Sequence, residues 1–105
     1  MKKVYIPNKS IHDFSAAEPF GELVFLSEGS LSRYKTSRIY RLFQNILKDS
    51  KRDDYLLVSG LTVLNLIAAL ILYDLHGQVN LLLFRNSNKG KHYLERVIKI
   101  DNKET

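Results

Sequence analysis

Residues 55–75 constrain the fold more than any other stretch, because these 21 residues are almost all apolar. A run of about 20 apolar residues can cross a bilayer as one helix. This run, however, contains Ser59, Gly60, Thr62 and Asn65, and carboxylates border or enter it (Asp53, Asp54 and Asp74). Polar and charged groups are costly inside a membrane, and a buried strand, a glycine turn and a helix account for the glycine. The stretch therefore predicts part of a soluble α/β domain and no membrane association.

Short apolar runs with turn residues at their ends predict five strands. The first, KVYIPN, ends at Pro7 and Asn8, the second, ELVFLSEG, ends at Gly29, and the third is YLLVSG. The last two, QVNLLLFR and HYLERVIKI, flank the Asn- and Gly-rich segment NSNKGK and predict a hairpin. Residues 9–21, between the first two strands, are rich in turn formers and contain Pro19, so we expect an irregular loop there.

Two segments predict helices. Between about Ser32 and Asp49 the apolar residues recur at the spacing of one helical face (Ile39, Leu42, Phe43, Ile46 and Leu47). Ser32 or Thr36 is expected to cap the start of this helix with a side-chain oxygen. The second helix, residues 61–76, is apolar almost all round and must be buried on several sides, with Gly77 as its C-cap.

These elements fit one domain. A chain of 105 residues can form one core but not two, so we expect a single α/β domain over residues 1–100 and a polar tail over residues 101–105. The alternation of strands and helices predicts a mixed sheet of about five strands with two main helices. A chain this short has few residues with which to cover so apolar a second helix, and we therefore expect a homodimer.

The composition argues against several kinds of site. The chain has no cysteine, which excludes disulfides, thiolate zinc sites and cysteine nucleophiles. The three histidines are scattered (His12, His76 and His92), so neither a metal site nor a cofactor is predicted. The apolar run near the N-terminus is broken by Pro7, which does not fit a signal peptide. We therefore expect a cytoplasmic protein, in the host cytoplasm if the protein is viral.

Positive charge is concentrated in one segment. The formal net charge is +5, and a surplus of that sign attracts nucleic acid, nucleotides or acidic proteins. Between residues 33 and 52, Asp49 alone opposes seven basic residues (Arg33, Lys35, Arg38, Arg41, Lys48, Lys51 and Arg52). These residues, with Tyr34 and Tyr40 among them, are candidates for binding DNA or RNA through its phosphates. The alternative is a solvated helix face.

The turn in VSGLTVLN is the main candidate for ligand binding. Where a strand passes into a helix, the first helical N–H groups have no internal partner, and the helix dipole favours an anion there. Ser59, Gly60 and Thr62 are therefore candidate contacts for a phosphate. Alternatively, Ser59 or Thr62 only caps the helix.

Other residues are candidates as well. Asn8 would lie near this turn if the first and third strands are central and parallel, and Arg38 and Arg41 are candidate helpers at a phosphate. His12 and Asp13 are the one neighbouring His–Asp pair and the candidate catalytic residues of a hydrolase. Adjacent residues do not by themselves form a catalytic site, so the pattern favours a binding protein. An enzyme would be a metal-independent phosphodiesterase or a small hydrolase.

The order of elements is similar to that of the small viral ring nucleases, which are dimeric α/β proteins that bind cyclic tetra-adenylate and blunt CRISPR defence. Two residues match as well, Asn8 after the first strand and Gly60 at the end of the third. The resemblance implies a nucleotide or cyclic oligonucleotide ligand and an anti-CRISPR protein. That family carries its catalytic histidine directly after this glycine. Leu61 occupies the position here, which leaves the cleavage chemistry without its histidine.

The sequence thus favours a binding module for a phosphate-bearing nucleotide or cyclic oligonucleotide, in a viral or mobile-element protein that counters host defence. The alternative is a nucleic-acid-binding protein that uses the basic segment 33–52. A hydrolase that acts through His12 and Asp13 is the third hypothesis.

Overall fold

The computed structural model describes residues 1–100, which form a five-stranded sheet with two α-helices and a 3-10 helix. In chain order the elements are β1 (Lys3–Ile6), η1 (Ser15–Phe20), β2 (Glu22–Phe25), α1 (Thr36–Leu47), β3 (Tyr55–Leu57), α2 (Thr62–His76), β4 (Val79–Ser87) and β5 (Gly90–Ile98). The prediction of a mixed α/β fold with about five strands, two main helices and a C-terminal hairpin is confirmed. The predicted polar tail, residues 101–105, lies outside the described residues.

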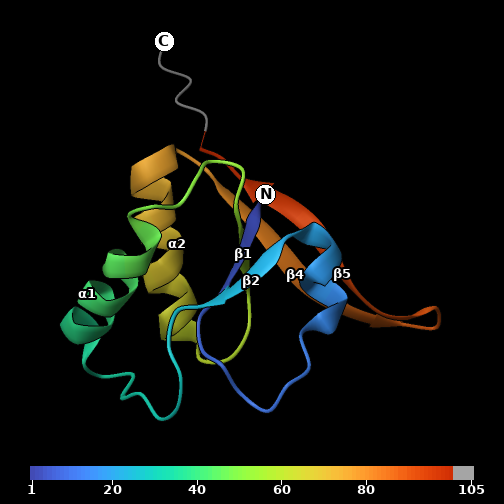
Figure 1. Ribbon diagram of the computed structural model, residues 1–105, viewed down its shortest axis with the longest axis horizontal. Helices are drawn as coiled ribbons and strands as arrows, with labels where there is room; N and C mark the ends of the chain where they lie inside the picture. Colours follow the sequence, from blue (N-terminus) through green and yellow to red (C-terminus); the bar gives the residue numbers. More distant parts are fainter. Residues whose placement is uncertain (101–105) are drawn as a thin grey trace.

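The strands lie in the order β2-β1-β3-β4-β5. The first four in this order are parallel to one another, and β5 pairs antiparallel with β4. The connection after β1 runs through η1 on one face of the sheet, and the connections after β2 and β3 run through α1 and α2 on the other (Figure 1). The direction in which strands are added therefore reverses between β1 and β3. In open α/β sheets, ligands bind beyond the carboxyl ends of the strands at such a point.

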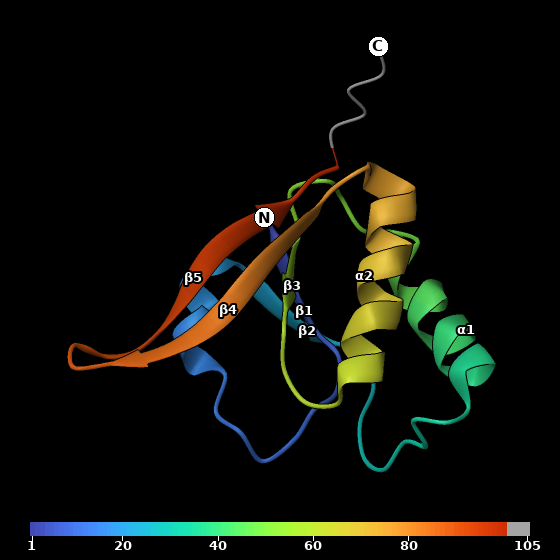
Figure 2. The same ribbon diagram turned by 180° about the vertical axis from the view of Figure 1, so that it is seen from behind.

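Side chains that alternate along the central strands form two cores, one on each face of the sheet. Helices α1 and α2 lie on one face (Figure 2). They pack there against Tyr5 of β1 and Leu56 of β3. On the other face, Phe14 and Ala17 pack against the strand residues that point the opposite way (Val4, Ile6, Tyr55 and Leu57). This division follows from the pleat of a strand, whose successive side chains point to opposite faces. Full burial of each large apolar side chain contributes about 1.5–3 kcal/mol, so both cores stabilise the sheet.

The first helix is shorter than predicted and lacks the predicted cap. Helix α1 begins at Thr36 with Lys35 in the N-cap position, and no side chain within residues 1–100 caps it. The expectation that Ser32 or Thr36 caps the helix is wrong. Thr36 is already helical, and Ser32 uses its backbone carbonyl to accept the N–H of Lys35 (3.2 Å). Of the five residues predicted on the apolar face, Ile39, Phe43 and Leu47 are buried and Ile46 is half-buried, whereas Leu42 is exposed.

Residues 9–21 are more regular than the predicted loop. The 3-10 helix η1 begins where the Asp13 carboxylate accepts the N–H of Ser15 (2.9 Å). Phe14 and Ala17 are buried and hold the segment against the sheet. The prediction of an irregular loop is wrong here, because a side chain such as that of Asp13 bonds to the backbone two residues on and can start a short helix.

Helix α2 has nearly the predicted bounds and the predicted C-cap, but in the single chain it is not buried on several sides as predicted, because Leu66, Leu70 and Leu75 are exposed. It ends at Gly77, whose φ of 75° lies in the left-handed region and whose N–H donates to the Tyr73 carbonyl (2.7 Å), as predicted for a C-cap. Its buried residues pack in the core shared with α1 (Leu64, Ala68, Ile71 and Leu72). None of the helices within residues 1–100 has the length and hydrophobicity needed to span a bilayer.

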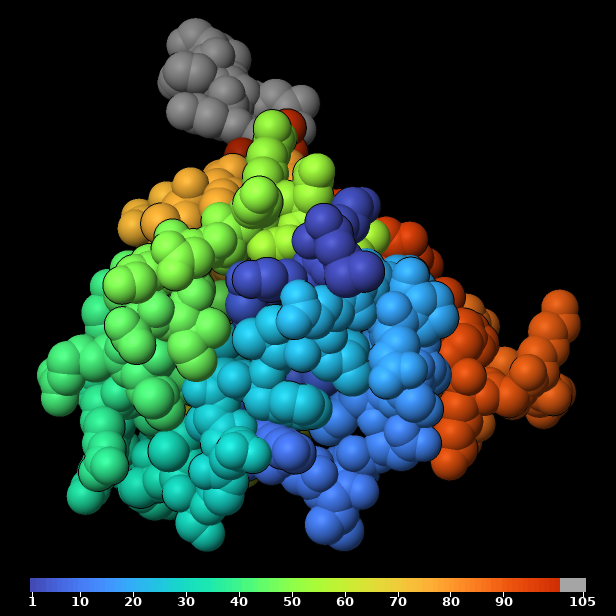
Figure 3. Space-filling view, viewed as in Figure 1, coloured from blue at the N-terminus to red at the C-terminus, as the bar shows by residue number. Residues whose placement is uncertain are grey.

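The C-terminal hairpin is longer than predicted and extends beyond the rest of the sheet. Strands β4 and β5 pair from Val79 with Ile98 to Ser87 with Gly90, so most of the predicted turn segment NSNKGK is strand. Strand β3 pairs with β4 only as far as Leu82. The remainder of the hairpin therefore projects from the body of the molecule (Figure 3).

Candidate functional site

The carboxyl ends of β1 and β3 lie side by side, because these two strands are neighbours in the middle of the sheet and run parallel. Asn8 follows β1, and Ser59 and Gly60 follow β3. From these ends the chain continues toward η1 on one face and toward α2 on the other (Figure 2). The structure therefore has the strand geometry on which the predicted position of Asn8 depends.

A pocket of about 450 Å³ opens at this edge of the sheet, between the loop after β1, the turn after β3 and the hairpin. Its lining residues are His12, Asp13, Phe14, Val58, Ser59, Gly60, Phe84, Lys91 and Tyr93. The pocket lies on the face that carries η1, since Phe14 and Tyr93 belong to the core of that face. We call it the aromatic pocket. It brings together four predicted site residues (His12, Asp13, Ser59 and Gly60).

The turn between β3 and α2 is held by a side chain that sequence reasoning missed. Gly60 lies in this turn with a φ of 73°. The Asn65 side chain accepts the N–H of Ser59 with Oδ1 (3.1 Å) and donates from Nδ2 to the carbonyls of Ser59 (2.8 Å) and Leu61 (2.9 Å). Asn65 therefore fixes the edge of the pocket that Ser59 and Gly60 form. Its signal in the sequence is an amide one turn into a largely apolar helix.

Neither Ser59 nor Thr62 caps α2. Leu61 occupies the N-cap position, and in the described part of the chain no side chain caps the helix. The alternative interpretation, that one of the two hydroxyls only caps the helix, is therefore wrong. Thr62 is also absent from the lining of the aromatic pocket, so Ser59 and Gly60 are the residues of the predicted turn site that contribute to it.

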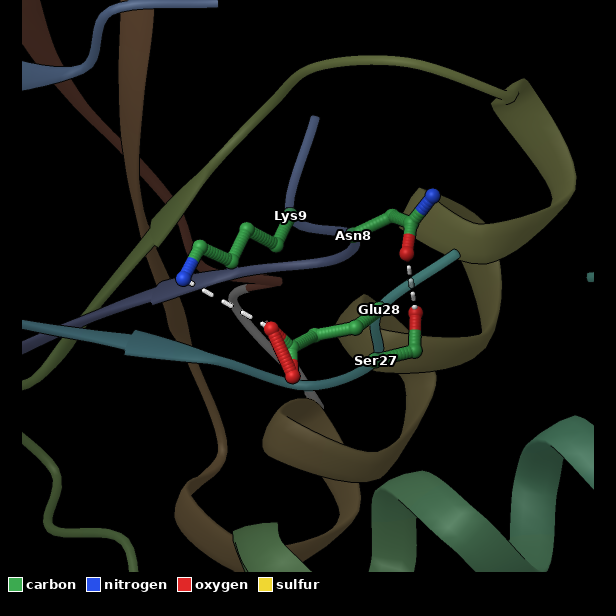
Figure 4. Close-up of polar contacts among 4 residues, drawn as sticks. All are labelled: Asn8, Lys9, Ser27 and Glu28. Atoms are coloured by element: carbon green, nitrogen blue, oxygen red, sulfur yellow. Dashed lines mark hydrogen bonds and ion pairs between the residues drawn. The ribbon is translucent and has the colours of Figure 1, made fainter. Parts of the chain in front are cut away.

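Asn8 joins the segments that follow β1 and β2 and does not line the aromatic pocket. Its Oδ1 lies 2.9 Å from the Ser27 hydroxyl (Figure 4), and its Nδ2 donates to the Gly29 carbonyl (3.2 Å). Beside it, the Lys9 ammonium lies 3.6 Å from the Glu28 carboxylate (Figure 4). An exposed pair of this kind contributes little to stability. Both partners of Asn8 lie about twenty residues away in the chain, so its side chain holds the two segments together.

His12 and Asp13 both line the pocket, but no hydrogen bond joins their side chains within residues 1–100. The Asp13 carboxylate accepts the N–H of Ser15, which lowers the pKa of Asp13 below its usual value. The His12 ring meets the Phe14 ring edge-on, with 6.2 Å between the ring centroids. The charged carboxylate thus holds the start of η1, and catalysis by this pair stays a prediction.

The hairpin supplies one wall of the pocket. Phe84 and Tyr93 are opposite each other on β4 and β5, and their rings meet edge-on with 5.6 Å between the centroids. Lys91 lies two residues from Tyr93 and so on the same face of β5. Burial raises the pKa of Tyr93, and the Asp13 charge raises it further, so the Tyr93 hydroxyl stays a hydrogen-bond donor. Sequence reasoning missed all three, because only the register of the hairpin shows which side chains reach the pocket.

Nearly the whole described part of the chain matches one known family. The match is to the family described as Phage Pam3 gp32-like protein, over residues 2–100. The chain belongs to this family. The phage protein in the family's description agrees with the predicted viral origin, while the ring-nuclease family and the anti-CRISPR role stay predictions. Comparison with curated proteins and with solved structures found no match.

The basic segment of this member of the phage family lies on and around α1. Arg38, Arg41 and Lys48 are exposed, so the predicted basic stripe faces solvent. The flanking basic residues are exposed as well (Arg33, Lys35, Lys51 and Arg52). Because α1 covers one face of the sheet and the aromatic pocket lies on the other, the structure does not bring Arg38 and Arg41 to Ser59 and Gly60.

Proposed function

We propose that this protein binds a phosphate-bearing nucleotide in the aromatic pocket. The observation that carries the proposal is a pocket with aromatic walls and a lysine, placed at the carboxyl ends of central parallel strands. Ligands of open α/β sheets gather at this place, and pockets of about 300–1,000 Å³ suit small organic ligands. The proposal keeps Ser59 and Gly60 as ligand contacts and adds Phe84, Lys91 and Tyr93.

The lining residues match the parts of a nucleotide. Phe84, which is 51% exposed, offers a ring on which a base stacks, and such stacking contributes about 1–3 kcal/mol per base. The Lys91 ammonium pairs with the phosphate, and the hydroxyls of Ser59 and Tyr93 donate hydrogen bonds to the ligand. The Asp13 carboxylate repels a phosphate, so the phosphate lies away from it. The carboxylate then accepts hydrogen bonds from ribose hydroxyls or from a base amine.

The size of the pocket favours a single nucleotide unit. A cavity of about 450 Å³ encloses a drug-sized ligand, and a ring of four nucleotides is much larger than that. A cyclic oligonucleotide would therefore place one base in the pocket and leave the remainder outside. In a protein of a phage family, retention of a nucleotide lowers its free concentration in the host. This is the way in which the protein would counter a nucleotide signal of host defence.

Calorimetric titration and thermal unfolding with nucleoside monophosphates, a nucleoside and cyclic tetra-adenylate test the proposal. A ligand at 100 times its Kd stabilises the fold by about 2.7 kcal/mol. Phe84→Ala and Lys91→Gln should each raise the Kd about tenfold or more. Lys89→Gln, at the exposed hairpin turn outside the pocket, removes the same charge and should bind like the wild type. The proposal is wrong if no nucleotide binds, or if Phe84→Ala and Lys91→Gln both keep the wild-type Kd, as the control does.

Exposure of the basic segment supports a second candidate function, the binding of DNA or RNA phosphates by Arg38, Arg41 and Lys48. The ion pair found within residues 1–100 joins Lys9 to Glu28, so Arg38, Arg41 and Lys48 have no carboxylate partner there. Replacement of all three by Gln should leave stability nearly unchanged, since surface substitutions usually stay within about 0.5 kcal/mol. It should abolish binding to a short duplex. An unchanged affinity and an unchanged salt dependence would exclude this function.

A further inference from the structure

Helices α1 and α2 leave an apolar groove on the side of the molecule away from the sheet. A cavity of about 280 Å³ lies between them, lined by Tyr40, Gln44, Ile67, Leu70, Ile71 and Asp74. Apolar side chains at or beside it are open to solvent: Tyr40 is 49%, Leu66 is 56% and Leu70 is 69% exposed. Exposed apolar patches mark interaction surfaces when they are contiguous. We call this surface the helix groove.

The two ends of the helix groove carry opposite charges. Past Tyr40 and Ile67 the groove continues to Arg41 in the first half of α1, and its other end is bounded by Asp74 near the end of α2. Both helices start at the same edge of the sheet and run in the same general direction (Figure 1), so Arg41 and Asp74 lie toward opposite ends. Neither residue forms an ion pair within residues 1–100.

We propose that the helix groove is a homodimer interface, occupied by the helix groove of a second copy of this chain. A two-fold axis through the middle of the groove brings the same surface of both copies together, so a residue at one end meets the residue at the other end of the partner. The exposed leucines of the two copies then bury each other. The Arg41 guanidinium of each copy meets the Asp74 carboxylate of the other.

The distribution of charge favours a second copy over a nucleic acid at this surface. Phosphates would neutralise Arg41, but they would be repelled by Asp74 and would leave Leu66 and Leu70 in water. An isologous interface instead requires a self-complementary surface, which an apolar centre with a cation at one end and a carboxylate at the other supplies. The apolar centre drives association, and the ion pairs at the rim fix the register.

Sedimentation velocity of the full chain over a range of concentrations tests the interface. The wild type should sediment as a dimer of the 12.2 kDa chain, and Leu70→Glu should raise the dimer Kd at least tenfold. The matched control is Leu42→Glu, which introduces the same charge at an exposed leucine of α1 that does not line the groove. This variant should keep the wild-type Kd. Circular dichroism shows whether both variants are folded.

A charge swap tests the two-fold arrangement itself. Arg41→Asp and Asp74→Arg should each raise the dimer Kd several-fold, because each places like charges together at both ends of the interface. The double variant should regain most of the wild-type affinity, since both ion pairs form again with reversed sign. A wild-type chain that sediments as a monomer throughout overturns the proposal. So does a Leu70→Glu variant that dimerises like the wild type, or a double variant as weak as the single ones.

Discussion

Gly60 turns the chain out of β3 with a backbone conformation that strains other residues. Its φ of 73° lies in the left-handed region, although an added Cβ would meet no atom of the described residues within 4 Å. The cost of a substitution is therefore backbone strain rather than a clash. We expect Gly60→Ala to lower the free energy of unfolding by about 1–2 kcal/mol. Urea denaturation measures the loss, with Thr62→Val as a control that stays within about 0.5 kcal/mol; equal stabilities would contradict the strain.

The Asn65 side chain, which projects from α2, stabilises the same turn. Its amide makes three hydrogen bonds to the backbone of Ser59 and Leu61. Asn65→Ala removes the partner of the partly buried N–H and carbonyl of Ser59, so we expect a loss of about 1–3 kcal/mol in the free energy of unfolding. Asn45→Ala, on the exposed face of α1, is the matched control and should change stability by less than about 0.5 kcal/mol. Equal effects of the two substitutions in urea denaturation would show that the Asn65 amide does not hold the turn.

The sequence predicted the part of the pocket that has a local signal. A glycine after a buried strand marks a turn, which is why Ser59 and Gly60 were found. His12 and Asp13 were candidates because they are neighbours in the sequence, whereas the hairpin residues depend on contacts between segments far apart in the chain (Phe84, Lys91 and Tyr93). Alternation along a strand shows which residues share a face, but it does not show which face meets the pocket. For the same reason, charge alone did not reveal that Arg38 and Arg41 lie on the other side of the sheet.

Helix α1 shows how far periodicity predicts an element. The spacing assigned Leu42 and Phe43 to the same apolar face, yet Phe43 is fully buried and Leu42 is 40% exposed, because the sheet and α2 cover only a stripe of the helix. Phe43→Ala is expected to lower the free energy of unfolding by about 3–5 kcal/mol. Leu42→Ala should cost much less. Similar losses for the two variants in urea denaturation would contradict this packing.

Element ends were harder to predict than element types. Gly77 was predicted as the C-cap because the left-handed residue that ends a helix is usually a glycine, which can be recognised from the local sequence. The start of α1 was missed, because no side chain caps it and the turn before it is closed by the backbone alone, with the Lys35 N–H donating to the Ser32 carbonyl. The hairpin strands were predicted too short, because the pairing of β4 with β5 continues through polar residues that resemble a loop.

Two tyrosines are expected to make the folded protein less stable at alkaline pH. Burial, with the nearby Asp54 carboxylate, raises the pKa of Tyr5 to about 12. The Glu95 carboxylate, which accepts the Tyr55 hydroxyl at 2.5 Å, raises the pKa of Tyr55 to about 12 as well. In the unfolded chain both hydroxyls lose their protons near pH 10. The stabilisation is therefore complete below about pH 10 and is lost as the pH rises toward about 12.

Urea denaturation at a series of alkaline pH values tests this dependence. The free energy of unfolding of the wild type should fall between about pH 10 and pH 12. Tyr55→Phe removes one of the two raised pKa values, so its stability should fall less over the same interval. A decline as steep as that of the wild type would show that the Tyr55–Glu95 bond does not contribute.

Beyond Leu82, among the described residues, β4 pairs with β5 alone, so this part of the hairpin is a two-stranded ribbon. A two-stranded ribbon by itself is marginally stable in water, so this wall of the aromatic pocket can open locally at a lower free energy than global unfolding requires. We therefore expect one side of the pocket, at the turn after β3, to be fixed and the hairpin side to open locally. A ligand that contacts both sides draws on the closed population alone, which lowers its apparent affinity in proportion. Amide protons of the projecting hairpin should therefore exchange faster than those of β3 in the free protein, and slow most when a ligand binds.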